Sequence, residues 1–226
     1  MEMSEEAFEC YMVSWEQAFK LARILARSVM NSGFLPDVVI GISRGGLVPA
    51  RTVGDLLLIK ELTSIKTEHW ETAVKHGETR IKHSLPIEAN ISGKKILVVD
   101  DVADTGDSFW AIIQYLQERD PLEIKTAALH FKTSSTFTPD YWGEKLEDWL
   151  WIVYPWAVYE DFIVFIKKLL AQPMTDEQLR KGLACNFNIR ISEKELNEML
   201  NDFQLSGKIK QLKKGKKILW GKIETQ

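Results

Sequence analysis

The stretch KILVVDDVADTGDS, residues 95–108, decides the fold of this chain. Its apolar run at 96–99 ends abruptly at two adjacent carboxylates, Asp100 and Asp101, and a loop of small residues follows at 103–108. Apolar residues at helical spacing come next, namely Phe109, Ile112, Ile113 and Leu116. This order predicts a buried parallel strand, a polar loop at its carboxyl end, and the start of a helix.

The chemistry of this loop suits one ligand, a ribose that carries a 5′-phosphate. Small residues let a phosphate approach backbone N–H groups, and the start of a helix adds positive partial charge. Adjacent carboxylates suit the vicinal diol of a ribose, or a Mg²⁺ ion bound to it. The plainer alternative is a solvated strand, loop and helix, because apolar strands that end in Asp-Asp also occur in receiver domains and in Mg²⁺-dependent phosphatases.

The same stretch resembles the phosphoribosyl-pyrophosphate (PRPP) signature of type I phosphoribosyltransferases. Members of that family transfer ribose 5-phosphate from PRPP to a nitrogen base and release pyrophosphate with Mg²⁺. The resemblance implies that Asp100 and Asp101 bind the ribose hydroxyls, and also Mg²⁺, directly or through water and PRPP. It implies that the 5′-phosphate lies against Asp104, Thr105, Gly106, Asp107 and Ser108. Asp107 departs from the pattern, because many purine members have Lys or Thr after the loop glycine.

A second buried strand is predicted at 38–42, and it runs into Ser43, Arg44, Gly45 and Gly46. Glycines after a strand allow backbone to approach an anion, and Arg44 supplies positive charge. The alternative is a simple turn with a solvated arginine. The run SRGGLVP at 43–49 resembles the pyrophosphate loop of bacterial guanine and xanthine phosphoribosyltransferases. That resemblance implies PRPP binding by Ser43, Arg44 and Gly45, a catalytic role for Arg44, and a cis peptide between Ser43 and Arg44.

A further strand is predicted at 62–70, and the polar segment after it has no clear pattern of its own. A long polar segment between two core strands is typical of a lid or of a disordered loop. In the family this place holds a flexible hood that closes over PRPP. We therefore expect residues 71–87 to form that hood, with a solvated hairpin as the alternative.

The base is expected to meet the ends of two later strands, predicted at 123–131 and 149–154. In 6-oxopurine members a lysine after the penultimate strand donates to O6 of the base, and Lys132 stands at that place. An aromatic residue of the last strand stacks on the purine, which implies Trp151, and the backbone of Ile152 then reads the base edge. The alternatives are a surface lysine and core tryptophans, and for Trp149 and Trp156 we expect core packing.

The implied reaction needs positioning and charge stabilisation more than covalent chemistry. Asp104 matches a family aspartate near N7 of the base and is the expected general base. The expected activity is that of a Mg²⁺-dependent glycosyltransferase, a pentosyltransferase of purine salvage. Lys132 favours hypoxanthine, guanine or xanthine, because a lysine facing a 6-amino donor would leave both groups unpaired. Two alternatives stay open, an adenine phosphoribosyltransferase and a PRPP- or purine-sensing DNA-binding regulator.

Composition agrees with an enzyme rather than a general nucleic-acid binder. The 226 residues are 45% hydrophobic and carry a net charge of −3. The two cysteines, Cys10 and Cys185, are far apart and have no metal-site spacing. No apolar run approaches the roughly 18 residues of a membrane span, and the N-terminus is acidic rather than signal-like. We expect a cytoplasmic protein that contacts no membrane.

The expected architecture is α/β, with two parts. Residues 1–158 are predicted to form the type I phosphoribosyltransferase fold, a mainly parallel five-stranded sheet flanked by helices. Residues 159–226 are predicted to form a small helical or winged-helix-like extension, as in some archaeal purine phosphoribosyltransferases. From residue 173 the chain has 11 Lys and Arg against 7 Asp and Glu, but the predicted second helix is acidic. Nucleic acid is therefore not the expected partner, and a homodimer is what the resemblance implies.

Overall fold

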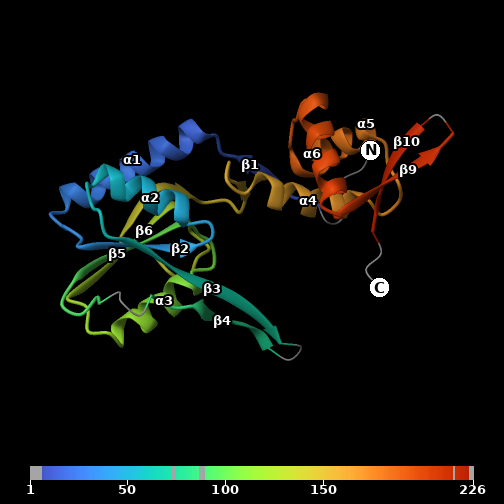
Figure 1. Ribbon diagram of the computed structural model, residues 1–226. Coiled ribbons are helices and arrows are strands. Elements are labelled where there is room, and N and C mark those ends of the chain that lie inside the picture. The colour runs from blue at the N-terminus through green and yellow to red at the C-terminus, as the bar shows by residue number, and fades with distance from the viewer. Residues whose placement is uncertain (1–6, 73–74, 87–89, 216, 224–226) are drawn as a thin grey trace. The chain divides into compact units, whose positions relative to one another are not determined.

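The computed structural model describes residues 7–72, 75–86, 90–215 and 217–223. The chain divides into two compact units, whose elements are labelled in Figure 1. One unit is Ser14–Trp149, and the other joins the described residues up to Val13 with the chain from Leu150 onward. This division differs from the expected boundary at residue 158. The reason is that strand β1 (Cys10–Met12) pairs in parallel with β8 (Trp151–Val153), which places the beginning of the chain in the C-terminal unit.

The first unit contains a six-stranded sheet with the order β4-β3-β2-β5-β6-β7. The strands β3, β2, β5, β6 and β7 are parallel to one another. β4 pairs with β3 in the antiparallel direction, at the edge of the sheet. The predicted mainly parallel five-stranded sheet is confirmed, with β4 as an addition. The bounds are β2 (Val38–Ser43), β3 (Leu62–Thr72), β4 (Lys75–His83), β5 (Lys95–Ala103), β6 (Glu123–Lys132) and β7 (Tyr141–Leu146).

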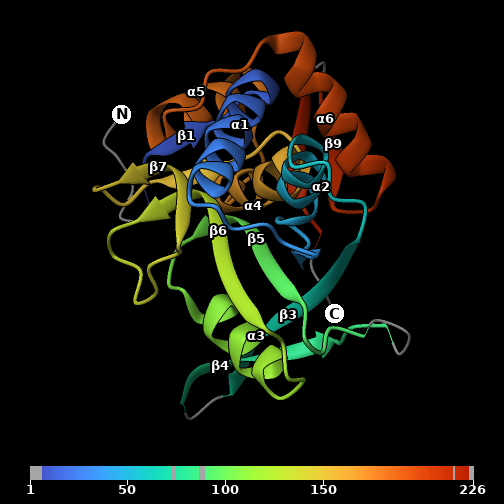
Figure 2. The ribbon, with the colours of Figure 1, turned by 90° about the vertical axis from the view of Figure 1, so that its left-hand side faces the viewer.

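Three helices cover the two faces of this sheet, α1 (Trp15–Asn31), α2 (Leu47–Leu56) and α3 (Asp107–Gln117). Figure 2 shows α1 and α2 on one face and α3 on the other. Because both faces are covered, β2 and the 96–99 part of β5 are continuous buried apolar runs. The α3 side packs Phe109, Ile112 and Leu116 of the helix against alternate residues of these strands. The burial holds the carboxyl ends of β2 and β5 at one edge of the sheet.

The predicted last strand of the sheet at 149–154 is corrected by the structure. The strand beside β6 is β7, whose polar residues gave no strand signal because β7 lies at the edge of the sheet and is only partly buried. The 149–154 run contributes only the three-residue β8, which pairs with β1 in a separate sheet. Pro155 has no backbone N–H to donate to a strand ladder, and it lies two residues after the end of β8.

The C-terminal unit has the order of elements of a winged helix. Helix α4 (Val158–Leu169) is followed by α5 (Asp176–Phe187), α6 (Glu193–Leu205) and the antiparallel hairpin of β9 (Ile209–Lys214) and β10 (Lys217–Lys222). Met174, between α4 and α5, forms a β-bridge to Trp220 of β10. Capping boxes at Thr175 and Ser192 set the starts of α5 and α6. In the described part of the chain, no helix has the length and apolar character needed to cross a membrane.

Candidate functional site

The loops that follow β2 and β5 meet because these two strands are parallel neighbours, in register from Val38 opposite Ile96 to Gly41 opposite Val99. The contact is close enough to require glycine on the β2 side. A Cβ at Gly45 would lie 2.2 Å from Asp101 Oδ2, and a Cβ at Gly46 would lie 2.5 Å from the carbonyl oxygen of Val99. The peptide bond between Ser43 and Arg44 is cis, which confirms that expectation.

The two carboxylates at the end of β5 are held side by side. The backbone N–H of Asp101 donates to Asp100 Oδ1 at 2.9 Å. Burial, and next the charge of Asp101, raise the pKa of Asp100 well above its usual range, although this hydrogen bond opposes the rise. Such a pair attracts hydroxyl donors or a cation.

The donor set fits Mg²⁺ only with help from the substrate. Among the described residues there is no group of three or more His, Cys, Asp and Glu side chains that could hold a metal ion. Mg²⁺ commonly binds through one or two carboxylates, water and substrate phosphates. Asp100 and Asp101 would hold the ion in that manner, and the remaining ligands would come from water and the ligand.

The predicted phosphate loop leads directly into α3, whose first N–H groups have no partner within the helix. Gly106 precedes the helix with φ +93°, and the Thr105 hydroxyl donates to Asp107 Oδ2 at 2.8 Å. The Ser108 and Thr67 hydroxyls lie 3.1 Å apart, which links the loop to β3. The unusual acid Asp107 thus takes part in the hydrogen bonding of the loop itself, and the backbone amides can serve an anion.

The loop after β6 packs against the predicted phosphate loop. A Cβ at Gly106 would lie 2.4 Å from Phe137 Cβ and 2.8 Å from the Phe137 nitrogen. The Thr136 backbone N–H donates to the Thr105 carbonyl at 2.9 Å. No motif in the sequence indicated this support, because residues 133–137 lie about 30 positions away along the chain.

Lys132 lies at the end of β6 beside the expected general base. Its side chain is only 4% exposed, and its Nζ lies 3.0 Å from Asp104 Oδ1. The Asp104 side chain is 45% exposed. Lys132 is therefore no ordinary surface lysine. Its Nζ also lies 5.0 Å from the ring centroid of Trp149. Trp149 is 51% exposed, so the expected core packing of this residue is wrong.

Trp151 and Ile152 belong to β8 in the C-terminal unit. The Trp151 ring centroid lies 5.6 Å from that of Phe8 and 5.8 Å from that of Phe165. Its indole N–H donates to Asp161 Oδ1 at 3.1 Å, and Ile152 is buried. Lys132 belongs to the other unit, so base binding by Trp151 and Ile152 stays a prediction.

His130 was not indicated by any sequence motif, yet it lies fully buried two residues before Lys132 on β6. Its Nε2 is 3.4 Å from Glu144 Oε2 on β7. Burial, and next the charge of Lys132, lower the pKa of His130 to about 4 despite the nearby Glu144. The imidazole is therefore neutral at neutral pH.

This lowered pKa predicts an acid-sensitive unit. The unfolded chain binds a proton at His130 below about pH 6.5 and the folded chain does not until about pH 4, so stability falls as the pH drops through this window. The expected loss is about 2 to 3 kcal/mol by about pH 4.5. Urea unfolding at neutral pH and at about pH 4.5 should show a smaller loss in His130→Phe and an unchanged loss in His83→Gln, at an exposed histidine.

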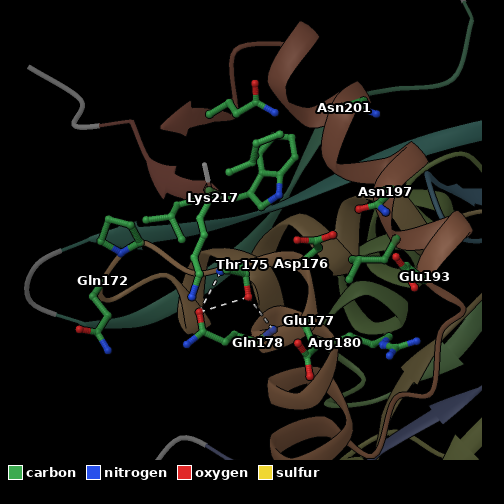
Figure 3. Close-up of a pocket in the computed structure, with 16 residues that line it drawn as sticks. Gln172, Thr175, Asp176, Glu177, Gln178, Arg180, Glu193, Asn197, Asn201 and Lys217 are labelled. Atoms are coloured by element: carbon green, nitrogen blue, oxygen red, sulfur yellow. Dashed lines mark hydrogen bonds between the residues drawn. The ribbon is translucent and has the colours of Figure 1, made fainter. Parts of the chain in front are cut away.

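A separate cavity of about 1310 Å³ lies in the C-terminal unit, beside α5, α6 and β10 (Figure 3). Its lining mixes the carboxylates of Asp176, Glu177 and Glu193 with the cations Arg180 and Lys217. It contains none of the residues expected to bind PRPP or a base. The candidate site is accordingly formed by the loops that follow β2, β5 and β6 in the Ser14–Trp149 unit.

Known proteins share this organisation. Residues 14–162 match the family described as phosphoribosyl transferase domain. The xanthine-guanine phosphoribosyltransferase of Idiomarina loihiensis is 29% identical over 153 residues, 68% of this chain and 90% of the relative. That of Cereibacter sphaeroides is 30% identical over 158 residues, again 68% of this chain and 90% of the relative.

Solved structures agree over the same part of the chain. The purine phosphoribosyltransferase of Pyrococcus horikoshii has a TM-score of 0.57 at 31% identity and covers 66% of this chain and 93% of its own. A hypothetical protein from Neisseria gonorrhoeae with bound ppGpp has a TM-score of 0.60 at 26% identity, and covers 66% and 89%.

Proposed function

Because the chain belongs to the phosphoribosyl transferase domain family, we propose that it transfers ribose 5-phosphate from PRPP to a 6-oxopurine. The products are a purine mononucleotide and pyrophosphate. The observation that carries the choice of base is the buried Lys132 ammonium beside Asp104, next to the loops that suit PRPP. The names of the two bacterial relatives, xanthine-guanine phosphoribosyltransferases, support the same choice.

The PRPP half of the site follows from the two loops. Asp100 and Asp101 accept hydrogen bonds from the ribose hydroxyls, and the backbone amides of 104–108 bind the 5′-phosphate. Ser43, Arg44 and Gly45 bind the pyrophosphate group, and Arg44 stabilises the charge that develops there. Mg²⁺ bound at Asp100 and Asp101 would supply further positive charge to the same phosphates.

The reaction exchanges one bond at C1 of the ribose. The bond from C1 to the pyrophosphate oxygen breaks, and its electron pair leaves with pyrophosphate while the ribose gains oxocarbenium character. One nitrogen of the purine's imidazole ring forms the new bond to C1, and the proton on the other nitrogen of that ring passes to the Asp104 carboxylate. Lys132 donates to O6 of the base during this step and stabilises the negative charge that develops on the base as the proton leaves.

The remaining parts of the proposal are predictions of the sequence. Trp151 stacks on the base and the Ile152 backbone reads its edge. The hood is the segment 71–87. Residues 71–72 belong to β3, and residues 75–86 form β4 and the three residues after it. Residues 73–74 and 87 lie outside the described part of the chain. A cytoplasmic homodimer completes the proposal.

One observation favours the alternative of a DNA-binding regulator, and one speaks against it. The hairpin of β9 and β10 is rich in lysine, which suits the phosphates of DNA. Helix α6, the helix that a winged helix would place in the major groove, exposes Glu193, Glu195, Glu198 and Asp202 against Lys194. These carboxylates would be repelled by phosphate, so the enzyme is the better-supported function.

The test is pyrophosphate release from PRPP and Mg²⁺ with adenine, hypoxanthine, guanine, xanthine and uracil offered singly. We expect turnover with at least one 6-oxopurine and far less with adenine. Turnover with adenine alone would keep the family activity and overturn the role of Lys132. PRPP binding without turnover of any base would favour the regulator, and a salt-dependent shift of duplex DNA would then support it.

A further inference from the structure

We propose that Trp149 is a specificity-determining positioning residue, which holds the Lys132 ammonium where the 6-substituent of a purine must accept a hydrogen bond. This role rests on the proposed function and adds to it a residue outside the family motifs quoted above. It starts from the contact between the Trp149 ring and Lys132 Nζ at 5.0 Å.

A buried ammonium depends strongly on its few partners. The Lys132 side chain is 4% exposed, and a charge removed from water in this way must be paired. Asp104 Oδ1 at 3.0 Å provides one partner, from a side chain that is 45% exposed. One contact sets a distance, whereas a second contact from the face of Trp149 also sets the direction of the ammonium. A cation is attracted more strongly to an indole face when the cation is removed from water, as the Lys132 ammonium is, although the indole itself is 51% exposed.

The backbone of the segment that leads to Trp149 is tied to the residue after Lys132. Lys132 is in register with Leu146 at the end of β7. Thr133 donates its backbone N–H to the Leu146 carbonyl at 2.9 Å and its hydroxyl to the Glu147 carbonyl at 3.2 Å. Trp149 follows two residues later. The indole therefore follows, two residues on, backbone that is hydrogen-bonded to the residue after the lysine it contacts.

A fixed ammonium discriminates between bases by hydrogen bonding alone. The oxygen of a 6-oxopurine accepts from Lys132, whereas the amino group of adenine presents donors to donors and leaves both unpaired. Without the indole, the contact with Asp104 no longer sets the direction of the ammonium, so Lys132 can turn away from the base and the penalty against adenine shrinks. The bond exchange at C1 depends on other residues, so the reaction itself should continue.

The test compares kcat/KM for adenine with kcat/KM for the 6-oxopurine that the wild type turns over fastest. We expect Trp149→Ala to lower the preference for the 6-oxopurine by about tenfold, about 1.4 kcal/mol. Trp149→Phe should keep most of the preference, because a phenyl ring still offers a π face. Trp15→Ala is the matched control, since Trp15 is 60% exposed on α1 in the same unit.

A double-mutant cycle separates this role from a merely structural one. Lys132→Met should abolish the preference, and adding Trp149→Ala to it should change the ratio no further, because the indole acts through the lysine. If Trp149→Ala lowered kcat/KM equally for both bases, or left their ratio unchanged in any other way, the role of Trp149 would be overturned and the proposed function would stand. A wild type without turnover of any 6-oxopurine would overturn the proposed function and this role together.

Discussion

Replacing Asp104 with Asn should lower kcat with a 6-oxopurine by about 100- to 10,000-fold, the range expected for loss of a positioned general base. The amide keeps the size of the side chain and one acceptor oxygen, but it cannot take the proton that the purine loses. It also removes the negative partner 3.0 Å from the buried Lys132. Single-turnover kinetics with bound PRPP would measure the chemical step directly.

The same variant should leave PRPP binding nearly unchanged, because the ribose carboxylates and the loop amides are intact. Glu118→Gln, which neutralises an exposed acid just beyond α3, serves as the charge control. If Asp104→Asn kept more than about a tenth of the wild-type kcat, the proton would leave by another route, for example through water, and the assignment of Asp104 would be wrong.

Replacing Gly106 with Ala should raise the KM for PRPP by about 100-fold or more, because small displacements of positioning groups cost that much. Two effects combine at this residue. Its φ of +93° disfavours any side chain, and the new Cβ would lie 2.4 Å from Phe137 Cβ and 2.8 Å from the Phe137 nitrogen. The loop must move to remove the overlap, and its amides move with it.

Gly93→Ala is the control that separates these two effects. Gly93 also has positive φ, +70°, but a Cβ there meets nothing within 4 Å. Both variants should lose stability from the backbone conformation, by about 1 to 2 kcal/mol. Only Gly106→Ala should also lose PRPP affinity. A wild-type KM for PRPP in a folded Gly106→Ala protein would exclude the loop amides as the phosphate site.

The features that the sequence predicted well are carried by contiguous residues. An apolar run, two carboxylates and a small-residue loop at 95–108 predict a strand, the polar loop at its end and the next helix together. The loop at 43–46 was expected to bind PRPP together with this loop, and parallel neighbouring strands bring the two to one edge of the sheet. The cis peptide at Ser43 followed from the resemblance of that loop.

The features that the sequence missed depend on residues far apart in the chain. β7 is a polar edge strand, and only its pairing with β6 reveals it. β1 joins the C-terminal unit because three residues near the N-terminus meet β8. The same holds for His130 beside Glu144 and for Phe137 beneath Gly106, pairs in which neither residue carries a motif.

The sequence alone predicted the fold class, the two loops expected to bind PRPP, and Lys132 as the residue expected to select the base. Local pattern suffices there, because a buried strand and a phosphate loop are each written in consecutive residues. The tertiary structure decided which tryptophan contacts Lys132. Trp149 and Trp151 are the same residue type and only two positions apart, so the sequence does not distinguish them. Their exposure and packing do, and these depend on strands and helices that are distant in the sequence.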